Sequence, residues 1–328
     1  MIERAYPTQM ATAISIFIGT FEKSAHFFLK SAYSMTTPLI KTSMIVFLVV
    51  IIITCVLAWK NRPRPNYSQI PKKLWTYWDN PDRMPKTVLL CMESWKKHHP
   101  DYEITLLTKK NYVGYVHIPL EIATHPNFHD NPTRFADLVR AYALKEHGGV
   151  WLDSSILLKE PLDNWLFPRY AELSGFYLGG GTKPELPPLL ENWFFACNKG
   201  SPFMKQWCEE FSQLAQYLTV QHYVDSRKQM GVDMEKIGDP VYLAMHVAAQ
   251  KVLQLDKYPL ESLYLQKAED GPFRYLADAK WDSHKAVRLA CQDKSYQGPI
   301  MKIRGAERGH LEAELTNELS NKRCGWLD

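Results

Sequence analysis

The segment 131–158, NPTRFADLVRAYALKEHGGVWLDSSILL, constrains the fold more than any other part of the chain. Its Asn-Pro start is typical of a helix beginning, because proline at the first helical position gives up an amide that would have no partner there. Apolar side chains from Phe135 to Ala143 then recur at helical spacing. The glycines at 148–149 end the helix where a left-handed residue is needed. The segment therefore predicts a helix, a stop and a new element in immediate succession.

The new element is a strand that ends at an acidic residue. Residues 150–152 are short and wholly apolar, which predicts an interior strand, and Asp153 follows at its carboxyl end, where open α/β sheets bind ligands. A buried carboxylate there needs a cation or hydrogen-bond donors nearby. Asp137 and Arg140 lie three residues apart on one helix face and can act together. A structural ion pair remains an alternative reading of these two residues. The residues alone support a role for Asp153 in binding a metal ion with its phosphate group as well as they support the other roles of this carboxylate.

Strand-like and helix-like segments alternate along the first half of residues 70–328, and helices gather later. This order predicts an α/β sheet with helical insertions. The further predicted strands are 73–78, 102–107, 156–158, 176–178 and 193–197, and the further predicted helices are 87–98, 203–218 and 240–255.

A transmembrane helix is predicted at 42–59, TSMIVFLVVIIITCVLAW, because its 18 residues include no charge. Such a helix would be about 27 Å long, close to the hydrocarbon core of roughly 30 Å. Lys41 and Lys60 bracket it, and Trp59 stands at an interfacial position. A buried core helix is the alternative, but the segment has no polar face.

The membrane segment divides the chain into an N-terminal segment (1–41), the helix, a polar linker (60–69) and one folded domain (70–328). The flanking charges lean slightly toward a cytosolic domain under the positive-inside rule. They do not decide between that orientation and a lumenal one. The N-terminal flank carries Lys23, Lys30 and Lys41, and the C-terminal flank carries Lys60, Arg62, Arg64, Lys72 and Lys73.

The net charge, the motifs that are missing and the spacing of the cysteines argue against several functions. A formal net charge of +4, without a basic cluster, gives no support for nucleic-acid binding. Phosphate-loop, dinucleotide-binding, serine-hydrolase and zinc-protease motifs do not occur in the sequence. None of the six cysteines forms a CxxC pair, although Cys291 and Cys324 could join in a disulfide, which the sequence leaves open.

Several motifs, in this order, resemble the capsular polysaccharide synthesis protein family, whose members are similar to glycosyltransferase family 32 and, more distantly, to the glucosylating domains of large toxins. The resemblance is densest over residues 70–160. Its motifs are IPKKLWTYW at 70–78, SWKKHHPDYEITLL at 94–107, GGVWLDSS at 148–155, ENWFFACNKGSP at 191–202, IGDPVY at 237–242 and PIMKIRG at 299–305.

The resemblance implies a GT-A-type nucleotide-sugar-binding sheet, a nucleotide-diphosphate-sugar donor and a divalent cation, Mn²⁺ or Mg²⁺. It implies that Asp153 is the first aspartate of a DxD motif that contacts metal and donor. Ser155 stands where many relatives have the second aspartate, which weakens metal binding by replacing a carboxylate with a hydroxyl. Asp137 and Arg140 match a helix pair that holds donor sugar hydroxyls and phosphate.

Further residues are implicated by the same resemblance. Trp78 matches an aromatic residue that stacks on the nucleotide base, and Trp151 a frequently aromatic position facing the same pocket, although core packing explains Trp151 equally well. Lys302 or Arg304 would neutralise charge on the departing diphosphate, and His310 would join them as a metal ligand. Exposed surface positions are the alternative for these last three.

Together these observations predict a membrane-anchored, retaining hexosyltransferase that moves a sugar to a glycan or glycolipid acceptor. The resemblance favours a Golgi-type lumenal domain, whereas the flanking charges lean cytosolic. Two alternatives remain: a metal-dependent nucleotidyltransferase or phosphoesterase, and a catalytically inactive module that binds sugar nucleotides. The phosphoesterase chemistry normally needs several carboxylates around two metals, and Ser155 argues against it.

Overall fold

The computed structural model separates the chain into two compact units, Met1–Arg64 and Pro65–Asp328. Among the described residues no helix has the length and apolar character to cross a bilayer. Most of the predicted membrane segment 42–59 lies outside them. The structure describes residues 70–164, 171–181, 183, 185–292 and 298–316, together with 47, 49–51 and 54.

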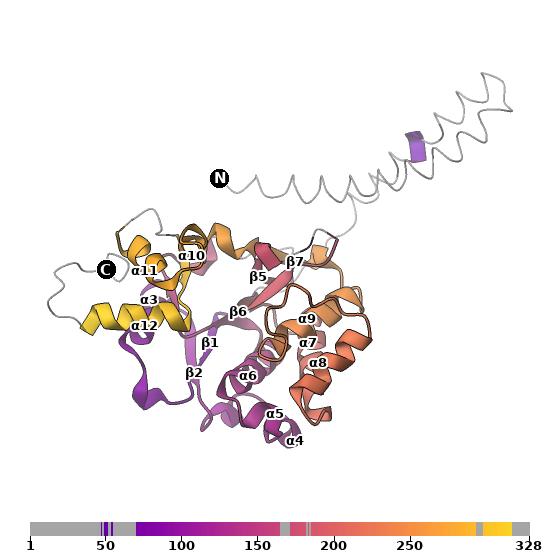
Figure 1. Cartoon of the computed structure of the whole chain (residues 1–328), viewed down its shortest axis with the longest axis horizontal. Helices are drawn as coiled ribbons and strands as arrows, with labels where there is room; N and C mark the ends of the chain where they lie inside the picture. The colour runs from indigo at the N-terminus through magenta and orange to yellow at the C-terminus, as the bar shows by residue number, and fades with distance from the viewer. Residues whose placement is uncertain are drawn as a thin grey trace. The chain divides into compact units, whose positions relative to one another are not determined.

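The second unit is a mixed α/β domain (Figure 1). Its strands are β1 (Lys73–Tyr77), β2 (Glu103–Leu107), β3 (Gly149–Leu152), β4 (Ile156–Leu158), β5 (Leu173–Leu178), β6 (Leu189–Cys197), β7 (Leu263–Lys267) and β8 (Ile300–Lys302). Its helices are α3 (Lys86–His98), α4 (Leu120–Ala123), α5 (Pro126–His129), α6 (Pro132–His147), α7 (Pro202–Ser212), α8 (Val220–Gln229), α9 (Ala244–Gln254), α10 (Arg274–Asp278), α11 (Ser283–Gln292) and α12 (Gly305–Thr316).

Six strands form the central sheet in the order β2-β1-β3-β6-β5-β7. Strand β1 runs parallel to both β2 and β3, so the carboxyl ends of these three strands meet at one edge. Strand β6 is antiparallel to β3 and β5. The remaining strands, β4 and β8, form a separate antiparallel pair. The C-terminal part of the chain thereby returns to the segment that follows β3.

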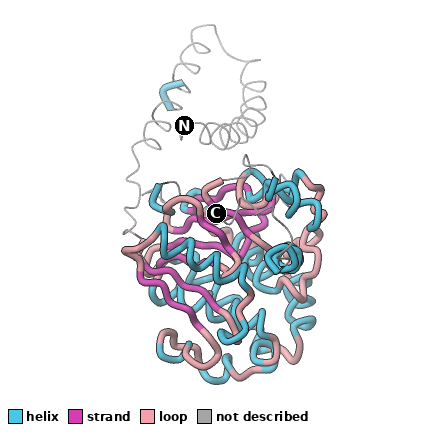
Figure 2. The backbone as a smooth tube through the Cα atoms, turned by 90° about the vertical axis from the view of Figure 1, so that its left-hand side faces the viewer, coloured by secondary structure: helices cyan, strands magenta, loops and turns pink. Residues whose placement is uncertain are grey.

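Helices cover both faces of the sheet (Figure 2). Each face has its own apolar core. Figure 1 shows α7, α8 and α9 on one side and α3, α10, α11 and α12 on the other. Alternation along β3 accounts for this, because Trp151 packs into the first core while Val150 and Leu152 pack into the second. Both cores therefore fix the strand that ends at the candidate site.

The junction between α6 and β3 follows the sequence prediction. The Asn131 side chain accepts from the backbone N–H of Arg134 and caps α6. Gly148 ends the helix with φ +64°, and Gly149 continues with φ +95°. Their lack of a side chain is also needed for space, because a Cβ on Gly149 would lie 2.6 Å from the backbone oxygen of Lys73. The two glycines let α6 and β3 join without a loop.

We expect Gly149→Ala to lower the free energy of unfolding by about 2–4 kcal/mol, since it combines backbone strain with a backbone clash. Gly200→Ala is the matched control, because Gly200 also has positive φ (+82°) but a Cβ at this position would meet no described atom within 4 Å. It should cost about 1 kcal/mol. Urea unfolding of both variants measures the difference, and equal costs would contradict the role of the close approach.

The predicted elements are largely confirmed, although the predicted helix 203–218 is an α-helix only as far as Ser212. Strands β7 and β8 and helices α4, α5, α10, α11 and α12 are present in addition to the predicted elements. Strand 156–158 has the predicted bounds but pairs with β8 outside the central sheet. The predicted helix 240–255 begins only at Ala244, because the Asp239 side chain accepts from two N–H groups of a preceding turn. Helix α8 is not predicted from the sequence, because its residues, VQHYVDSRKQ, have only a weak apolar stripe.

The structure shows the oxidation state of four of the cysteines. Cys91, Cys197 and Cys208 are buried free thiols. Cys291 is disulfide-bonded. Cys324, the partner that the sequence leaves open for it, lies outside the described residues.

Candidate active site

Asp153 follows β3 at the edge where the carboxyl ends of the parallel strands meet. Its backbone N–H donates to the Trp193 carbonyl on β6 at 2.9 Å, which fixes the main chain. The Trp151 indole Nε1 donates to Asp153 Oδ1 at 3.1 Å. The Asp153 side chain remains 27% exposed. The carboxylate is thus held from several sides but still reaches the surface.

Two cations flank this carboxylate. Arg140 Nη2, from α6, donates to Oδ1 at 2.6 Å, and Lys302 Nζ, from β8, donates to Oδ2 at 2.7 Å. The same ammonium lies 3.4 Å from the Ser155 hydroxyl. Arg140 is only 4% exposed and Lys302 9%. Helix α6 and strand β8 therefore each bring one buried positive charge to Asp153.

Asp137 extends the cluster on the α6 side. Arg140 Nη1 donates to its Oδ1 at 2.8 Å, which confirms the predicted pairing on one helix face. Asn192 on β6 donates to the same oxygen at 3.1 Å. We call Asp137, Arg140, Asp153, Ser155 and Lys302 the Asp153 cluster. Its members come from α6, the segment after β3, and β8.

The two aspartates have opposite pKa shifts. Burial raises the pKa of Asp137 from 3.8 to about 6, against the lowering effect of Arg140. Burial acts in the same direction on Asp153, but Lys302 and Arg140 outweigh it and lower the pKa of that carboxyl below its ordinary value. Asp153 is therefore an anion at neutral pH, and Asp137 takes up a proton in mildly acidic solution.

The raised pKa of Asp137 gives a defined pH dependence of stability. Between about pH 4 and 6 the folded protein keeps a proton that the unfolded chain has lost, so the contribution of Asp137 falls as pH rises. We expect the free energy of unfolding of the wild type, relative to Asp137→Asn, to decrease over that interval. Urea unfolding at several pH values from about 4 to 7 checks this. Parallel curves for the two proteins would contradict it.

The other predicted site residues lie in different surroundings. Trp151 is fully buried, and the Arg140 guanidinium stacks over its ring at 4.9 Å, so the residue is both core and cluster support. Trp78 is half-buried beneath the Arg308 guanidinium at 5.4 Å. His310 meets the ring of His284 edge-on at 5.2 Å. No described contact joins Trp78 or His310 to the Asp153 cluster.

Arg304, the alternative to Lys302 for charge neutralisation, is engaged elsewhere. Its guanidinium donates to both carboxylate oxygens of Glu307, at 2.9 and 2.8 Å. It also stacks over the Trp281 ring at 5.3 Å. Of the two predicted basic residues, Lys302 is the one at Asp153.

Sequence reasoning missed three residues around the cluster. Asn192 holds Asp137, as described above. Glu191 accepts from the Trp193 indole at 2.6 Å, and burial raises the pKa of Glu191 to about 7. Tyr242 is 57% exposed, and burial of part of its side chain, together with the charges of Asp137 and Asp153, raises its pKa above the ordinary value. Two of the motifs quoted above, ENWFFACNKGSP and IGDPVY, contain these residues, but nothing in their spacing singles them out.

The residues present do not fit a divalent metal site. Within the part of the chain that the structure describes, no group of three or more histidine, cysteine, aspartate or glutamate side chains comes together to hold an ion. Asp153 is the one carboxylate of the predicted ligand set, and both of its oxygens accept from cations. Ser155 is already within reach of Lys302.

A second buried cluster offers a comparison within the same domain. Glu210 on α7 pairs through one oxygen with Arg227 and through the other with Lys251, at 3.4 Å. We call these three residues the Glu210 triad. Like Asp153, Glu210 bridges an arginine and a lysine. No described hydrogen bond or ion pair connects the triad to the Asp153 cluster, which makes its residues suitable controls.

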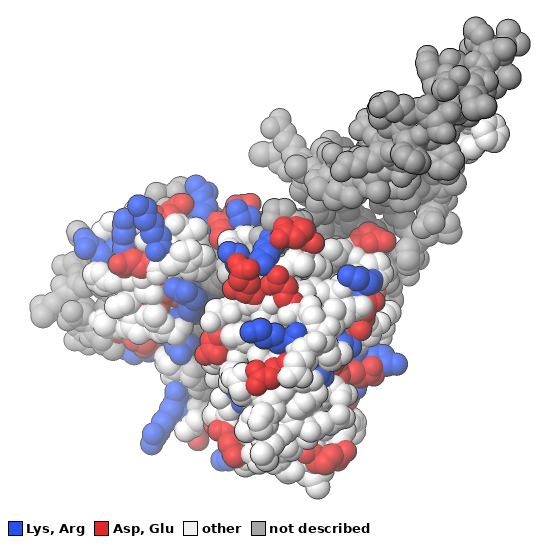
Figure 3. All heavy atoms as spheres, turned by 45° about the vertical axis from the view of Figure 1, so that its right-hand side comes forward, with Lys and Arg blue, Asp and Glu red and all other residues white. Residues whose placement is uncertain are grey.

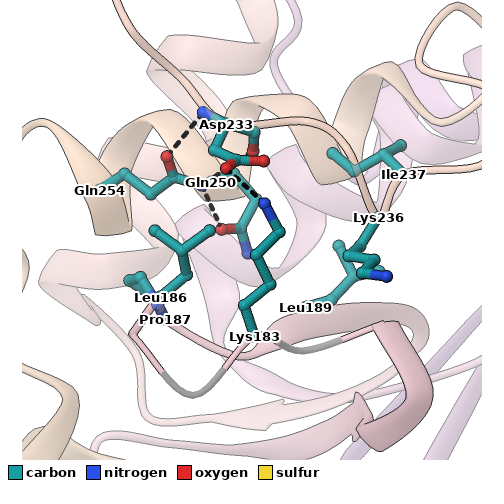
Figure 4. A pocket seen from close by; sticks show the side chains of 9 residues that line it. All are labelled: Lys183, Leu186, Pro187, Leu189, Asp233, Lys236, Ile237, Gln250 and Gln254. Atoms are coloured by element: carbon teal, nitrogen blue, oxygen red, sulfur yellow. Dashed lines mark hydrogen bonds and ion pairs between the residues drawn. The ribbon is translucent and has the colours of Figure 1, made fainter.

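The surface charges of the described residues are mixed in sign. On the face in Figure 3, basic and acidic side chains are interspersed. A small pocket contains Lys183, which pairs with Asp233 at 2.8 Å (Figure 4) and with Glu235 at 2.7 Å. It includes none of the predicted site residues. Its lining comprises Lys183, Leu186, Pro187, Leu189, Asp233, Lys236, Ile237, Gln250 and Gln254.

Known proteins resemble the chain at several levels. An "O-glycosyltransferase braB" from Annulohypoxylon truncatum is 28% identical over 173 residues, which cover 48% of this chain and 40% of that relative's length. The PaToxG glycosyltransferase superposes with a TM-score of 0.39 at 15% identity, covering 68% of this chain and 93% of that one.

The galactosyltransferase LgtC, in a complex with donor and acceptor sugar analogues, gives a TM-score of 0.38 at 12% identity over 74% of this chain and 96% of its own. Both superpositions are too weak to transfer any detail of a site. The sequence pattern of the "Capsular polysaccharide synthesis protein" family matches residues 57–229, which is more than half of the chain. The chain belongs to the capsular polysaccharide synthesis protein family.

Proposed function

We propose that this protein is a glycosyltransferase of GT-A type that moves a sugar from a nucleotide-diphosphate-sugar donor to a glycan or glycolipid acceptor. Family membership and the braB relative support the reaction class. The single observation that supports the site is the convergence of Arg140 and Lys302 on Asp153 at the carboxyl end of β3.

This arrangement suits the departure of a nucleoside diphosphate. Negative charge develops on the phosphate oxygens as the sugar–oxygen bond breaks, and fixed positive groups stabilise that charge more in the transition state than in the bound donor. Arg140 and Lys302 are buried and held by Asp153, so they need little reorganisation when the charge appears. Asp153 would hold both cations in place and turn them toward the diphosphate.

The remaining cluster residues fit roles in donor recognition. Asp137 would accept from donor sugar hydroxyls, a role that needs its ionised form. Trp78 would stack on the nucleotide base, as the family resemblance implies, and its indole is only half-buried. The family resemblance favours a hexose donor and retention of the anomeric configuration, and product stereochemistry determined by NMR tests the latter.

We also propose that the chain is anchored by a single transmembrane helix at 42–59, with the catalytic domain on the lumenal side. The uncharged stretch supports the anchor. The disulfide at Cys291 supports an oxidising compartment, because structural disulfides are rare in the cytosol. Protease protection of the C-terminal domain in sealed microsomes is the expected result, and digestion without detergent would indicate a cytosolic domain.

A panel of nucleotide sugars tests the proposed reaction directly. The full-length chain in detergent is incubated with UDP-, GDP- and CMP-linked sugars, and nucleotide release is measured with and without glycan and glycolipid acceptors. Turnover of one donor with sugar transfer supports the proposal. Saturable donor binding without turnover would indicate a sugar-nucleotide-binding module. Cleavage of phosphodiesters without sugar transfer would indicate a phosphoesterase.

A further inference from the structure

The position of Lys302 is fixed by its surroundings. Strand β8 places Lys302 opposite Ile156 in the β4–β8 pair, and the Lys302 carbonyl accepts from the Tyr275 hydroxyl at 2.7 Å. The next residue, Ile303, donates its backbone N–H to the Ser155 carbonyl at 2.9 Å. The main chain at Ser155 is thus tied to the main chain that carries Lys302.

The Lys302 ammonium contacts both side chains of the DxD-like motif that would hold a cation. It lies 2.7 Å from Asp153 Oδ2 and 3.4 Å from Ser155 Oγ, the side chains of the first and last residues of this motif. A Mg²⁺ or Mn²⁺ ion on the same carboxylate oxygen would lie about 2 Å from it. It would then be in near contact with a buried ammonium, and the repulsion between the two charges would be strong in this weakly solvated place.

We propose that Lys302 replaces the divalent cation of this site, so that Lys302 and Arg140 neutralise the donor diphosphate and the enzyme works without a metal. This inference rests on the proposed function for its substrate, a nucleoside diphosphate sugar. Two fixed monovalent cations supply the same formal charge as one divalent ion. The serine at 155 is then expected, since Lys302 already pairs with the Asp153 carboxylate and a second carboxylate would have no metal ion to bind.

Metal binding itself is the first test, and it needs no donor turnover. The full-length chain is titrated with Mn²⁺ while the free-ion signal is followed by electron paramagnetic resonance, alone and with UDP or GDP. We expect no stoichiometric binding to the wild type. Binding of one Mn²⁺ per chain that is lost in Asp153→Asn would overturn the inference.

Turnover with chelator is the second test. Wild-type donor turnover in EDTA should stay within about twofold of its value in Mn²⁺, whereas Lys302→Ala should lose roughly 10²-fold, as expected when a charge stabiliser is removed. A wild-type loss of about tenfold or more in EDTA, restored by Mn²⁺, would overturn the inference. Lys251→Ala, which removes a partly buried lysine of the Glu210 triad, controls for the structural effect and should retain the wild-type response.

A double variant that is designed to bind a metal ion is the third test. Lys302→Ala combined with Ser155→Asp restores a two-carboxylate motif and removes the competing ammonium, so we expect this double variant to acquire stoichiometric Mn²⁺ binding. Should either variant fail to fold, the two wild-type measurements still decide the question. If no nucleotide sugar is bound or turned over under any condition, the proposed function fails, while the Mn²⁺ titration separately tells whether Lys302 excludes a metal.

Discussion

Asp153→Asn is expected to lower sugar transfer by about 10²-fold or more, as for the loss of a main electrostatic group. The reason lies in the two oxygens of Asp153, which hold Arg140 and Lys302 at 2.6 and 2.7 Å. An amide has one acceptor oxygen and carries no charge, so it cannot hold both cations. The measurement is kcat and KM for the donor that the nucleotide-sugar panel identifies.

The same substitution should also reduce stability, because Lys302 loses its carboxylate while it stays 9% exposed. Asp153 reaches solvent, so we expect a loss of about 2 kcal/mol, less than for a fully buried pair. Glu210→Gln is the matched control, since Glu210 bridges Arg227 and Lys251 in the same way. It should destabilise the protein and leave kcat near the wild-type value. Equal losses of kcat in both variants would show that Asp153 acts only through folding.

Arg140→Met should lower the free energy of unfolding by about 3–5 kcal/mol, because it leaves Asp137 buried without this cation. Removing Arg140 also removes an influence that lowers the pKa of Asp137, so that pKa should rise above about 6. The deficit should be larger at about pH 8 than at about pH 5, where Asp137 is neutral in the folded protein. Urea unfolding at the two pH values measures it.

Arg227→Met is the control for this prediction. Arg227 is buried against Glu210, so its loss should also destabilise the chain. Donor turnover of the folded fraction should fall steeply in Arg140→Met only, because Arg140, unlike Arg227, contacts Asp153. A deficit for Arg140→Met that does not change with pH would mean that Asp137 is not the group left unpaired.

The site could be predicted from sequence where its determinants are local. The Asn131 cap, the Asp137–Arg140 spacing and the glycines at 148–149 act within one helix and its stop, so the pattern predicts them directly. The short apolar strand likewise locates Asp153. These features depend on helical periodicity and on φ, which neighbouring residues determine.

The residues that complete the site depend on distant pairings. Lys302 reaches Asp153 only because β8 pairs with β4, and nothing near Lys302 in the sequence indicates that register. The family resemblance, rather than periodicity, pointed to it. Asn192 faces Asp137 because β6 lies beside β3, a neighbourhood that the strand patterns alone leave undetermined. The predicted roles of Trp78 and His310 stay predictions, since contacts with Arg308 and His284 do not test them.

The pairing of β4 with β8 has a consequence for biosynthesis. Asp153 and Lys302 are 149 positions apart, so a nascent chain can complete α6 and β3 long before Lys302 has left the ribosome. Until Lys302 has been synthesised, Arg140 is the one cation of the Asp153 cluster that can pair with Asp153. Translation products that stop before residue 300 would retain the strands of the central sheet and still lack Lys302, so the Asp153 cluster is completed only after β8 has been synthesised.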